Sequence, residues 1–210
     1  MRRSRRGRLV ALEGIDGVGK TTLLRGLAGA LRRRGFSVAV RREPADPRLG
    51  ALAQSAAAED AWTGAVYFTV DRHLAAAGLT RALRRHDVVL QDRSFYSTLA
   101  YQGSALPPRD RQRLEQLQRS ATRVPDRVLW LELPPVEALR RLGDRPSRRG
   151  PLERRRTLER VARTYRALAR SRRWVVLDAR EPPRTLLRQA LERLDLPTLG
   201  PRGRPRRTRR

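Results

Sequence analysis

The sequence contains no cysteine, and Lys20 is its one lysine among 48 lysine and arginine residues. The absence of cysteine excludes disulfide bonds and thiolate metal sites, and it is typical of the reducing cytoplasm, where we expect this chain. No run of about 18 apolar residues is present, so we expect no helix that spans a membrane. The basic N-terminus is like that of a secretory signal, but its apolar run, LVAL, stops before Glu13 and is too short for one.

Acidic residues are also few, with 21 against 48 basic residues and a net charge of +27. The segments 1–8 and 196–210 carry five and six arginines and no acidic residue. A charge of this size favours polyanionic partners such as nucleotides, nucleic acid or anionic lipid. The codon bias of a GC-rich genome is an alternative explanation. We therefore expect nucleic-acid binding through the basic ends to be incidental.

Short apolar segments alternate with helical patterns along the chain. We expect strands at 8–13, 36–43, 87–92, 126–133 and 174–178. We expect helices from the glycine-rich turn to about 34, over about 48–85 with a break near Thr63-Gly64, beyond Arg93, and at 109–121, 135–142, 152–172 and 183–195. Unbroken apolar strands that alternate with helices predict an α/β domain with a parallel sheet covered on both faces.

The folded domain is expected at 8–195, after a basic extension at 1–7. The segment 196–210 has too little apolar content to fold, so it is interpreted as a basic, disordered tail.

The stretch GIDGVGKT has the pattern G-x-x-x-x-G-K-T, with Gly14, Gly19, Lys20 and Thr21 at its fixed positions. It follows an expected strand and opens an expected helix, the context of a phosphate-binding loop (P-loop). Its N–H groups can surround phosphate oxygens, the Thr21 hydroxyl can bind Mg²⁺, and the Lys20 ammonium can lie between β- and γ-phosphates. A compact ammonium fits inside such a loop, whereas a planar guanidinium is too broad, which explains the lone lysine. The loop serves kinases, GTPases and nucleic-acid motors alike.

Two further segments carry candidate site residues. Asp92 ends the third expected strand, where the carboxyl edge of the sheet meets the phosphate site, and it is suited to hold Mg²⁺ directly or through water. Arg93 beside it is suited to grip the phosphate of an acceptor. Phe68 and Arg72 are four residues apart on one face of an expected helix, so their side chains can meet the same bound base.

Together these segments resemble the thymidylate kinase family. The matching segments, in the family's order, are EGIDGVGKTT (13–22), REP (42–44), FTVDR (68–72), DRSFYSTLAYQG (92–103), PDRVLWLELPPVEALRR (125–141), TYRALA (164–169) and VVLDA (175–179). The resemblance implies a P-loop NTPase fold with a five-stranded parallel sheet in the order 2-3-1-4-5 and a mobile lid. It implies transfer of the ATP γ-phosphate to dTMP to give dTDP, with Mg²⁺ as cofactor, by a homodimer.

The resemblance also implies roles for individual residues. Phe68 would stack on thymine, Arg72 would hydrogen-bond its edge, and Arg93 would hold the dTMP phosphate. The residues implied for ATP are Gly14, Ile15, Asp16, Gly17, Val18, Gly19, Lys20, Thr21 and Thr22. Those implied for dTMP are Asp16, Arg42, Glu43, Pro44, Phe68, Arg72, Arg93, Ser97, Tyr101 and Gln102, and those for the metal are Thr21 and Asp92.

The family's lid corresponds to 143–151 in this chain. One branch of the family has a catalytic arginine within the P-loop, whereas the other, largely bacterial, branch supplies it from the lid. The variable P-loop positions here, 15–18, contain no arginine, so the chain resembles the lid-arginine branch. The implied catalytic residues are Lys20, Asp16, Arg93, Arg145, Arg148 and Arg149. Ala45-Asp46 departs from the family's usual glycines after Pro44.

Three other functions are compatible with the sequence. A deoxynucleoside kinase would use Glu43 as the base for a neutral hydroxyl acceptor, but Asp16 and the AYQG segment favour a monophosphate acceptor. A kinase for a modified pyrimidine nucleotide is a closely related alternative. A nucleic-acid-binding protein on a degenerate P-loop scaffold belongs to another class and is motivated by the charge of +27. Tight, steeply salt-dependent duplex binding without catalysis would identify it.

Overall fold

The structure is a computed structural model that describes residues 7–143, 155–194 and 196. Most of the expected lid, including Arg145, Arg148 and Arg149, lies outside the described residues. So do the expected basic extension up to residue 6 and the expected tail from residue 197.

Five parallel strands form one sheet in the order β2-β3-β1-β4-β5, which confirms the expected order. The strands are β1 (Arg8–Glu13), β2 (Val38–Arg42), β3 (Val88–Asp92), β4 (Arg127–Glu132) and β5 (Val175–Asp178). The register sets Leu12 of β1 opposite Asp92 of β3, and Asp92 opposite Arg42 of β2. The carboxyl ends of these three strands are therefore level, and polar side chains gather along that edge.

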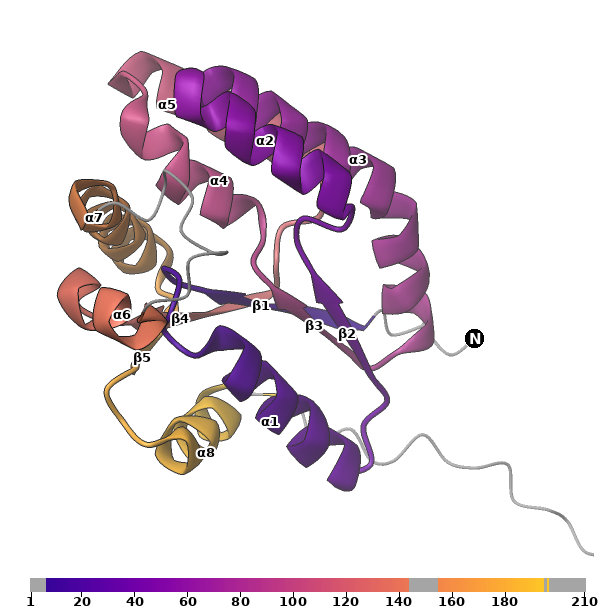
Figure 1. The fold of residues 1–210 in the computed structure, drawn as a ribbon. Helices are drawn as coiled ribbons and strands as arrows, with labels where there is room; N and C mark the ends of the chain where they lie inside the picture. The colour runs from indigo at the N-terminus through magenta and orange to yellow at the C-terminus, as the bar shows by residue number, and fades with distance from the viewer. Residues whose placement is uncertain (1–6, 144–154, 195, 197–210) are drawn as a thin grey trace, which may run out of the picture.

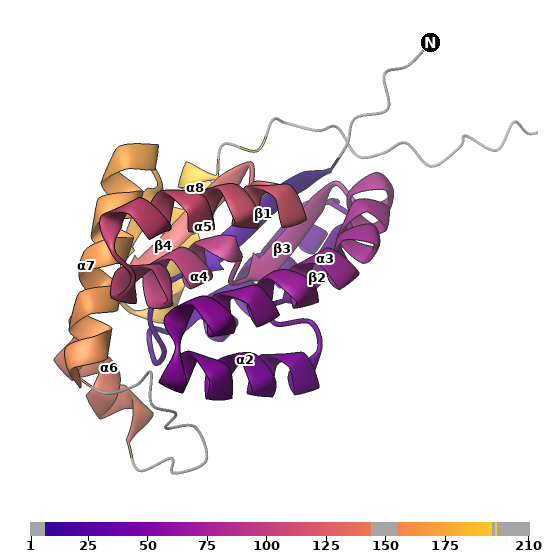
Figure 2. The same ribbon diagram turned by 90° about the horizontal axis from the view of Figure 1, so that it is seen from above.

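Helices cover both faces of the sheet, as the apolar strands predict. α1 (Lys20–Arg33) and α8 (Pro183–Arg193) pack together on one face; α3 (Ala61–Arg85), α4 (Phe95–Tyr101), α5 (Pro108–Ala121) and α7 (Arg155–Arg172) cover the other (Figure 1). α2 (Pro47–Glu59) packs on α3, and α6 (Pro135–Leu142) lies beside α7 (Figure 2). A 3₁₀ turn (Gly103–Ala105) follows α4. The central strands β1 and β3 lie between these layers, and Leu9, Leu12 and Leu90 are fully buried.

The expected break in the helical region that forms α2 and α3 is confirmed, but it lies at Asp60 and not at Thr63-Gly64. The chain breaks at Asp60, whose extended backbone ends α2 and whose carboxylate accepts hydrogen bonds of 2.6 Å from the N–H and the hydroxyl of Thr63 to cap α3. Gly64 lies inside α3, where a Cβ would come within 2.4 Å of the Ala57 Cβ on α2. The glycine therefore permits close helix packing and does not end a helix.

Two residues next to the expected domain boundaries contact the folded part, while the boundaries themselves stay predictions. Gly7 belongs to the folded part, since its N–H donates to the carbonyl of Leu83 at 2.7 Å and a Cβ on it would collide with the carbonyl of His86. At the other end, Leu196 is partly buried against the core. None of the helices in the described part of the chain has the length and apolar character needed to span a bilayer.

Candidate active site

The P-loop connects the carboxyl end of β1 to the first turn of α1. Gly14 and Gly17 have positive φ values of 140° and 83°, which glycine adopts more easily than other residues. A Cβ at Gly14 would come within 2.7 Å of the Leu131 carbonyl, and one at Gly17 within 2.7 Å of the Ala138 carbonyl. The side chains of Ile15 and Val18 are buried, so only the backbone at these two positions is available to phosphate.

Lys20 is the first residue of α1, and its side chain is only 7% exposed. Its ammonium donates to the carbonyl oxygens of Gly14 at 3.0 Å and Ile15 at 2.8 Å, within the loop itself. Burial disfavours the charged amine and Arg93 repels it, and together they lower the pKa of Lys20 to about 8, although Asp16 opposes them. This cation is poorly solvated and is therefore well prepared to bind phosphate.

Asp16 lies between the P-loop lysine and the arginine that follows β3. Its Oδ1 accepts a 2.5 Å hydrogen bond from Arg93 Nη2 and is 4.0 Å from Lys20 Nζ, while Oδ2 accepts from the hydroxyl of Tyr101 at 3.4 Å. Burial raises the pKa of Asp16, but the charges of Arg93 and Lys20 outweigh it and hold the pKa at about 2. The carboxylate is therefore ionised at neutral pH and joins two separate parts of the site.

Arg93 turns the chain sharply after β3. Its φ of 69° is left-handed, which costs a residue other than glycine about 1–2 kcal/mol. The guanidinium lies 5.3 Å from the centroid of the Tyr101 ring, and Nη1 donates to Ser97 Oγ at 3.0 Å. Burial disfavours the charged guanidinium, yet Asp16 outweighs burial and raises the pKa of Arg93, so it stays cationic.

Thr21 and Asp92 form the candidate metal site. The Thr21 hydroxyl donates to Asp92 Oδ2 at 3.1 Å, which joins the start of α1 to the end of β3. Asp92 Oδ1 is buried and has no hydrogen-bond partner among the described residues. A hydroxyl and a carboxylate with a free oxygen are ligands that Mg²⁺ accepts. In the described part of the chain no three His, Cys, Asp or Glu residues cluster as metal ligands, so nucleotide phosphates and water would have to complete the shell.

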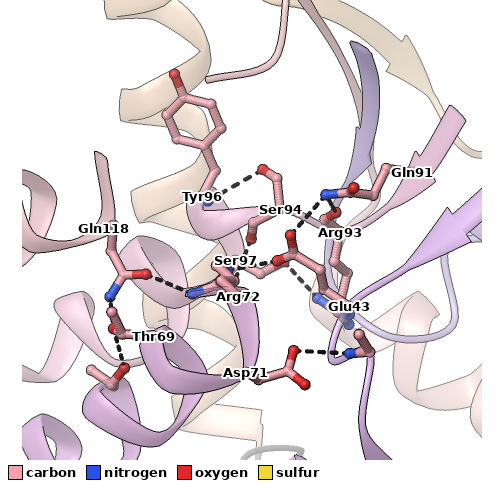
Figure 3. A network of polar contacts seen from close by, with 12 residues as sticks. Glu43, Thr69, Asp71, Arg72, Gln91, Arg93, Ser94, Tyr96, Ser97 and Gln118 are labelled. Atoms are coloured by element: carbon pink, nitrogen blue, oxygen red, sulfur yellow. Dashed lines mark hydrogen bonds and ion pairs between the residues drawn. The ribbon is translucent and has the colours of Figure 1, made fainter. Parts of the chain in front are cut away.

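Arg72 is buried in a polar network around the end of β2 (Figure 3). It donates to Glu43 at 2.6 Å, to the Gln118 side chain at 2.6 Å and to the Ser94 carbonyl at 3.3 Å. Glu43 also accepts from Gln91 at 2.8 Å, and burial raises its pKa although Arg72 opposes this. These bonds use three of the five N–H groups of the guanidinium with partners in the described part of the chain. The other two N–H groups make no hydrogen bond to the described residues.

Asp71, which precedes Arg72 on α3, holds the loop that follows β2. Asp71 accepts hydrogen bonds of 2.8 Å from the N–H groups of both Ala45 and Asp46, the two positions that depart from the family's glycines. The Glu43-Pro44 peptide bond is cis. Asp71 therefore fixes this loop through the loop's own backbone N–H groups. The path of the loop does not depend on the side chains that replace the glycines.

The remaining predicted site residues differ in their exposure. Phe68 is half-buried, with its ring centroid 6.0 Å from the Arg72 guanidinium carbon, as the four-residue spacing predicts. Gln102 is buried, and its amide nitrogen has no partner among the described residues. Arg42 and Thr22 are exposed. The roles assigned to these side chains stay predictions.

Two buried residues beside the site were missed from the sequence. Glu13, the last residue of β1, accepts hydrogen bonds from Ser94 and Ser97, and Tyr165 of α7 donates to it at 2.9 Å. A charged residue at the end of an apolar strand, just before Gly14, was a usable indication for Glu13. Tyr165 fits the apolar spacing of α7, so the sequence indicates a core residue and nothing more.

Comparison with known proteins agrees with this geometry. The family model described as thymidylate kinase matches residues 12–190. A thymidylate kinase of Prochlorococcus marinus (strain MIT 9313) is 39% identical over 188 residues, which cover 82% of this chain and 87% of that protein. A thymidylate kinase of Xanthomonas euvesicatoria pv. vesicatoria (strain 85-10) is 41% identical over 189 residues, which cover 88% of this chain and 81% of that protein. A thymidylate kinase of Parasynechococcus marenigrum (strain WH8102) is 36% identical over 209 residues, which cover 92% of this chain and 99% of that protein.

The matched range begins in β1, includes the P-loop and every described residue of the candidate site from Glu13 to Tyr165, and ends in α8. The family model covers most of the chain, the relatives are of similar length, and the sheet has the predicted strand order. The chain belongs to the thymidylate kinase family.

Proposed function

We propose that this chain transfers the γ-phosphate of ATP to dTMP and releases ADP and dTDP. The observation that carries the proposal is the position of Asp16 between Lys20 and Arg93. The P-loop lysine marks the side of the phosphate donor, and Arg93 is a fixed cation that contacts the same carboxylate oxygen, Asp16 Oδ1. An anionic acceptor held by Arg93 would therefore lie next to the terminal phosphate of ATP.

The proposed reaction requires little covalent chemistry from the protein. An oxygen of the dTMP phosphate attacks the γ-phosphorus, and the bond to the oxygen that bridges the β- and γ-phosphorus atoms breaks. Positioning of the two phosphates and neutralisation of their charge account for catalysis in such reactions. Lys20 and the loop N–H groups would hold the donor, and Arg93 would hold the acceptor.

We propose that Mg²⁺ accompanies ATP at Thr21 and Asp92. Bound there, the ion would neutralise charge on the phosphates. The free oxygen of Asp92 and its contact with Thr21 support this assignment. The further catalytic cation that the lid-arginine branch implies would come from Arg145, Arg148 or Arg149, and this assignment stays a prediction from the sequence.

The surroundings of Phe68 and Arg72 support the proposal that the protein recognises its acceptor by a pyrimidine base. The ring is partly exposed for stacking, and two N–H groups of the guanidinium make no hydrogen bond to the described residues, so they could donate to a base edge that reaches them. The alternative of a deoxynucleoside kinase needs Glu43 as a free base. Both carboxylate oxygens of Glu43 accept hydrogen bonds, from Arg72 and Gln91, which favours the monophosphate acceptor.

We also propose that the chain forms a homodimer through α3. Four exposed apolar residues follow one stripe of this helix, and Leu52 of α2, the helix that packs on α3, is exposed as well. The four are Val66, Tyr67, Val70 and Leu74. Exposed apolar stripes of this kind are typical of protein interfaces. Val70→Asp should convert the dimer to a monomer in light scattering, and an unchanged mass would contradict this interface.

The proposed reaction is tested with a panel of nucleotides assayed with ATP and Mg²⁺. We expect turnover of dTMP at least tenfold above that of dUMP, dCMP, dGMP and AMP, and no turnover of thymidine. Turnover of thymidine would favour the deoxynucleoside kinase. Absence of turnover with every monophosphate would contradict the proposed function.

A further inference from the structure

Glu13 is a fully buried carboxylate in contact with four hydrogen-bond donors. Its Oε1 accepts from the N–H of Ser94 at 2.7 Å and from the Ser94 hydroxyl at 2.6 Å. Its Oε2 accepts from the hydroxyls of Ser97 at 2.7 Å and Tyr165 at 2.9 Å. A buried charge is retained only where such bonds compensate for lost solvation. These partners come from the turn after β3, from α4 and from α7, so this carboxylate joins β1 to three other parts of the fold.

The hydroxyl protons of Ser97 and Tyr165 can both be directed at Glu13. The oxygens of Ser97 and Tyr165 are 2.9 Å apart, but each hydroxyl has one proton, and each is within reach of the acceptor-only Glu13 Oε2. With both protons directed at Glu13, the lone pairs of Ser97 Oγ face Arg93 Nη1, which donates to it at 3.0 Å. Glu13 thereby turns Ser97 into an acceptor for the guanidinium.

Glu13 also holds the backbone next to Arg93. The left-handed φ of 69° at Arg93 directs the following N–H, that of Ser94, to Glu13 Oε1. The N–H of Arg93 itself donates to the Leu12 carbonyl at 3.0 Å, one residue before Glu13. Both the turn that carries Arg93 and the serine that receives its guanidinium are therefore fixed by the end of β1.

We infer that Glu13, with Ser97 and Tyr165, forms a buried positioning network that sets the orientation of Arg93 toward the acceptor phosphate. None of the three needs to touch the reacting atoms for this role. Tyr165 gives the network a link to α7, the helix that begins at Arg155 and follows the segment 144–154. The inference rests on the proposed function, because it assigns Arg93 to the phosphate of dTMP.

The test compares two ligands that differ only in the phosphate. Binding of dTMP and of thymidine is measured by calorimetry for the wild-type chain, Tyr165→Phe, Ser97→Ala and Glu13→Gln. If the network orients Arg93, each variant should bind dTMP about tenfold more weakly, the loss expected for one hydrogen bond in a charged network. Binding of thymidine should change less than twofold, because it has no phosphate for Arg93 to hold.

Tyr96→Phe is the matched control. Tyr96 is another buried tyrosine, adjacent to Ser97 on α4, but its side chain points away from the network (Figure 3) and lies beside Arg172. Removal of its hydroxyl should leave the affinity for dTMP unchanged. The double variant Tyr165→Phe/Ser97→Ala should lose little more than either single variant, since both act through the same guanidinium.

Kinetics separate positioning from general disruption. The variants should raise the KM for dTMP about tenfold and leave the KM for ATP within twofold, with melting temperatures recorded to follow the fold. Equal weakening of dTMP and thymidine, or unchanged binding of dTMP in Tyr165→Phe, would overturn the inference while leaving the proposed function intact. A wild-type chain that fails to distinguish dTMP from thymidine would overturn the proposed function and the inference with it.

Discussion

The titration of Lys20 should change activity and stability in opposite directions. Its pKa is lowered from 10.5 to about 8 by burial and by Arg93, so the free protein keeps the ammonium about nine-tenths protonated at pH 7 and about one-tenth at pH 9. If only the charged form binds the phosphates of ATP, kcat/KM for ATP should fall about tenfold per pH unit above pH 8. The substrate phosphates have lost their protons below this range and add nothing to the decline.

Stability should rise across the same range. The unfolded chain holds the lysine proton up to pH 10.5 and the folded chain only to about 8, so the unfolded state binds more protons between these values. The free energy of unfolding then increases with pH, by at most about 3 kcal/mol. Tyr101, whose pKa burial raises, acts in the opposite direction above pH 10, because the unfolded chain ionises first. The useful window is therefore pH 8 to 10.

The measurements are kcat/KM for ATP at saturating dTMP, and urea unfolding of the ligand-free chain, each from pH 7 to 10. Lys20→Met is the control, because it keeps the length of the side chain and removes the amine. Its stability should lack the rise above pH 8, and most of kcat should be lost at every pH. An activity profile that stays flat to pH 9.5, or an equal rise in stability for Lys20→Met, would refute the reasoning.

Three substitutions test other parts of the structure. Phe68→Ala should weaken the binding of dTMP by about 1–3 kcal/mol, if stacking on the base contributes as it does in other nucleotide-binding proteins, and should leave the KM for ATP unchanged. Equal losses of affinity for dTMP and ATP would contradict this. Gly64→Ala should lower the free energy of unfolding by about 1–3 kcal/mol, because the new methyl group meets Ala57 at 2.4 Å; Gly29→Ala, where the only contact within 4 Å is a flexible arginine end at 3.4 Å, is the control. Asp92→Asn should raise the Mg²⁺ concentration needed for half-maximal rate about tenfold or more, whereas an unchanged Mg²⁺ dependence would argue against a metal role.

The sheet and the P-loop could be predicted because each is determined by residues that are close together in the sequence. An apolar run such as RLVALE identifies a strand from its own residues, and the spacing of Gly14, Gly19 and Lys20 identifies the turn after it. Gly64 was misinterpreted for the opposite reason. Its role depends on Ala57 of another helix, which local preference does not describe.

The polar networks could be predicted only in part. The partners of the buried Glu13 lie 81 to 152 residues away, and no periodicity links such positions. The pairing of Arg72 with Glu43 likewise joins α3 to the end of β2. Family resemblance named Arg72 and Arg93 as ligand-binding residues, but which protein groups hold them became visible only in three dimensions.

The single lysine has a use beyond phosphate binding. A lysine-specific protease meets one cleavage site in the whole chain and would release residues 1–20, whereas arginine-specific proteases find sites throughout. That site lies in the first turn of α1, where the N–H of Leu23 donates to the Gly19 carbonyl at 3.0 Å. Cleavage of the native protein therefore requires the junction of β1 and α1 to open. The appearance of the two fragments, 1–20 and 21–210, would report that opening, and its suppression by ATP would report the free energy of ATP binding.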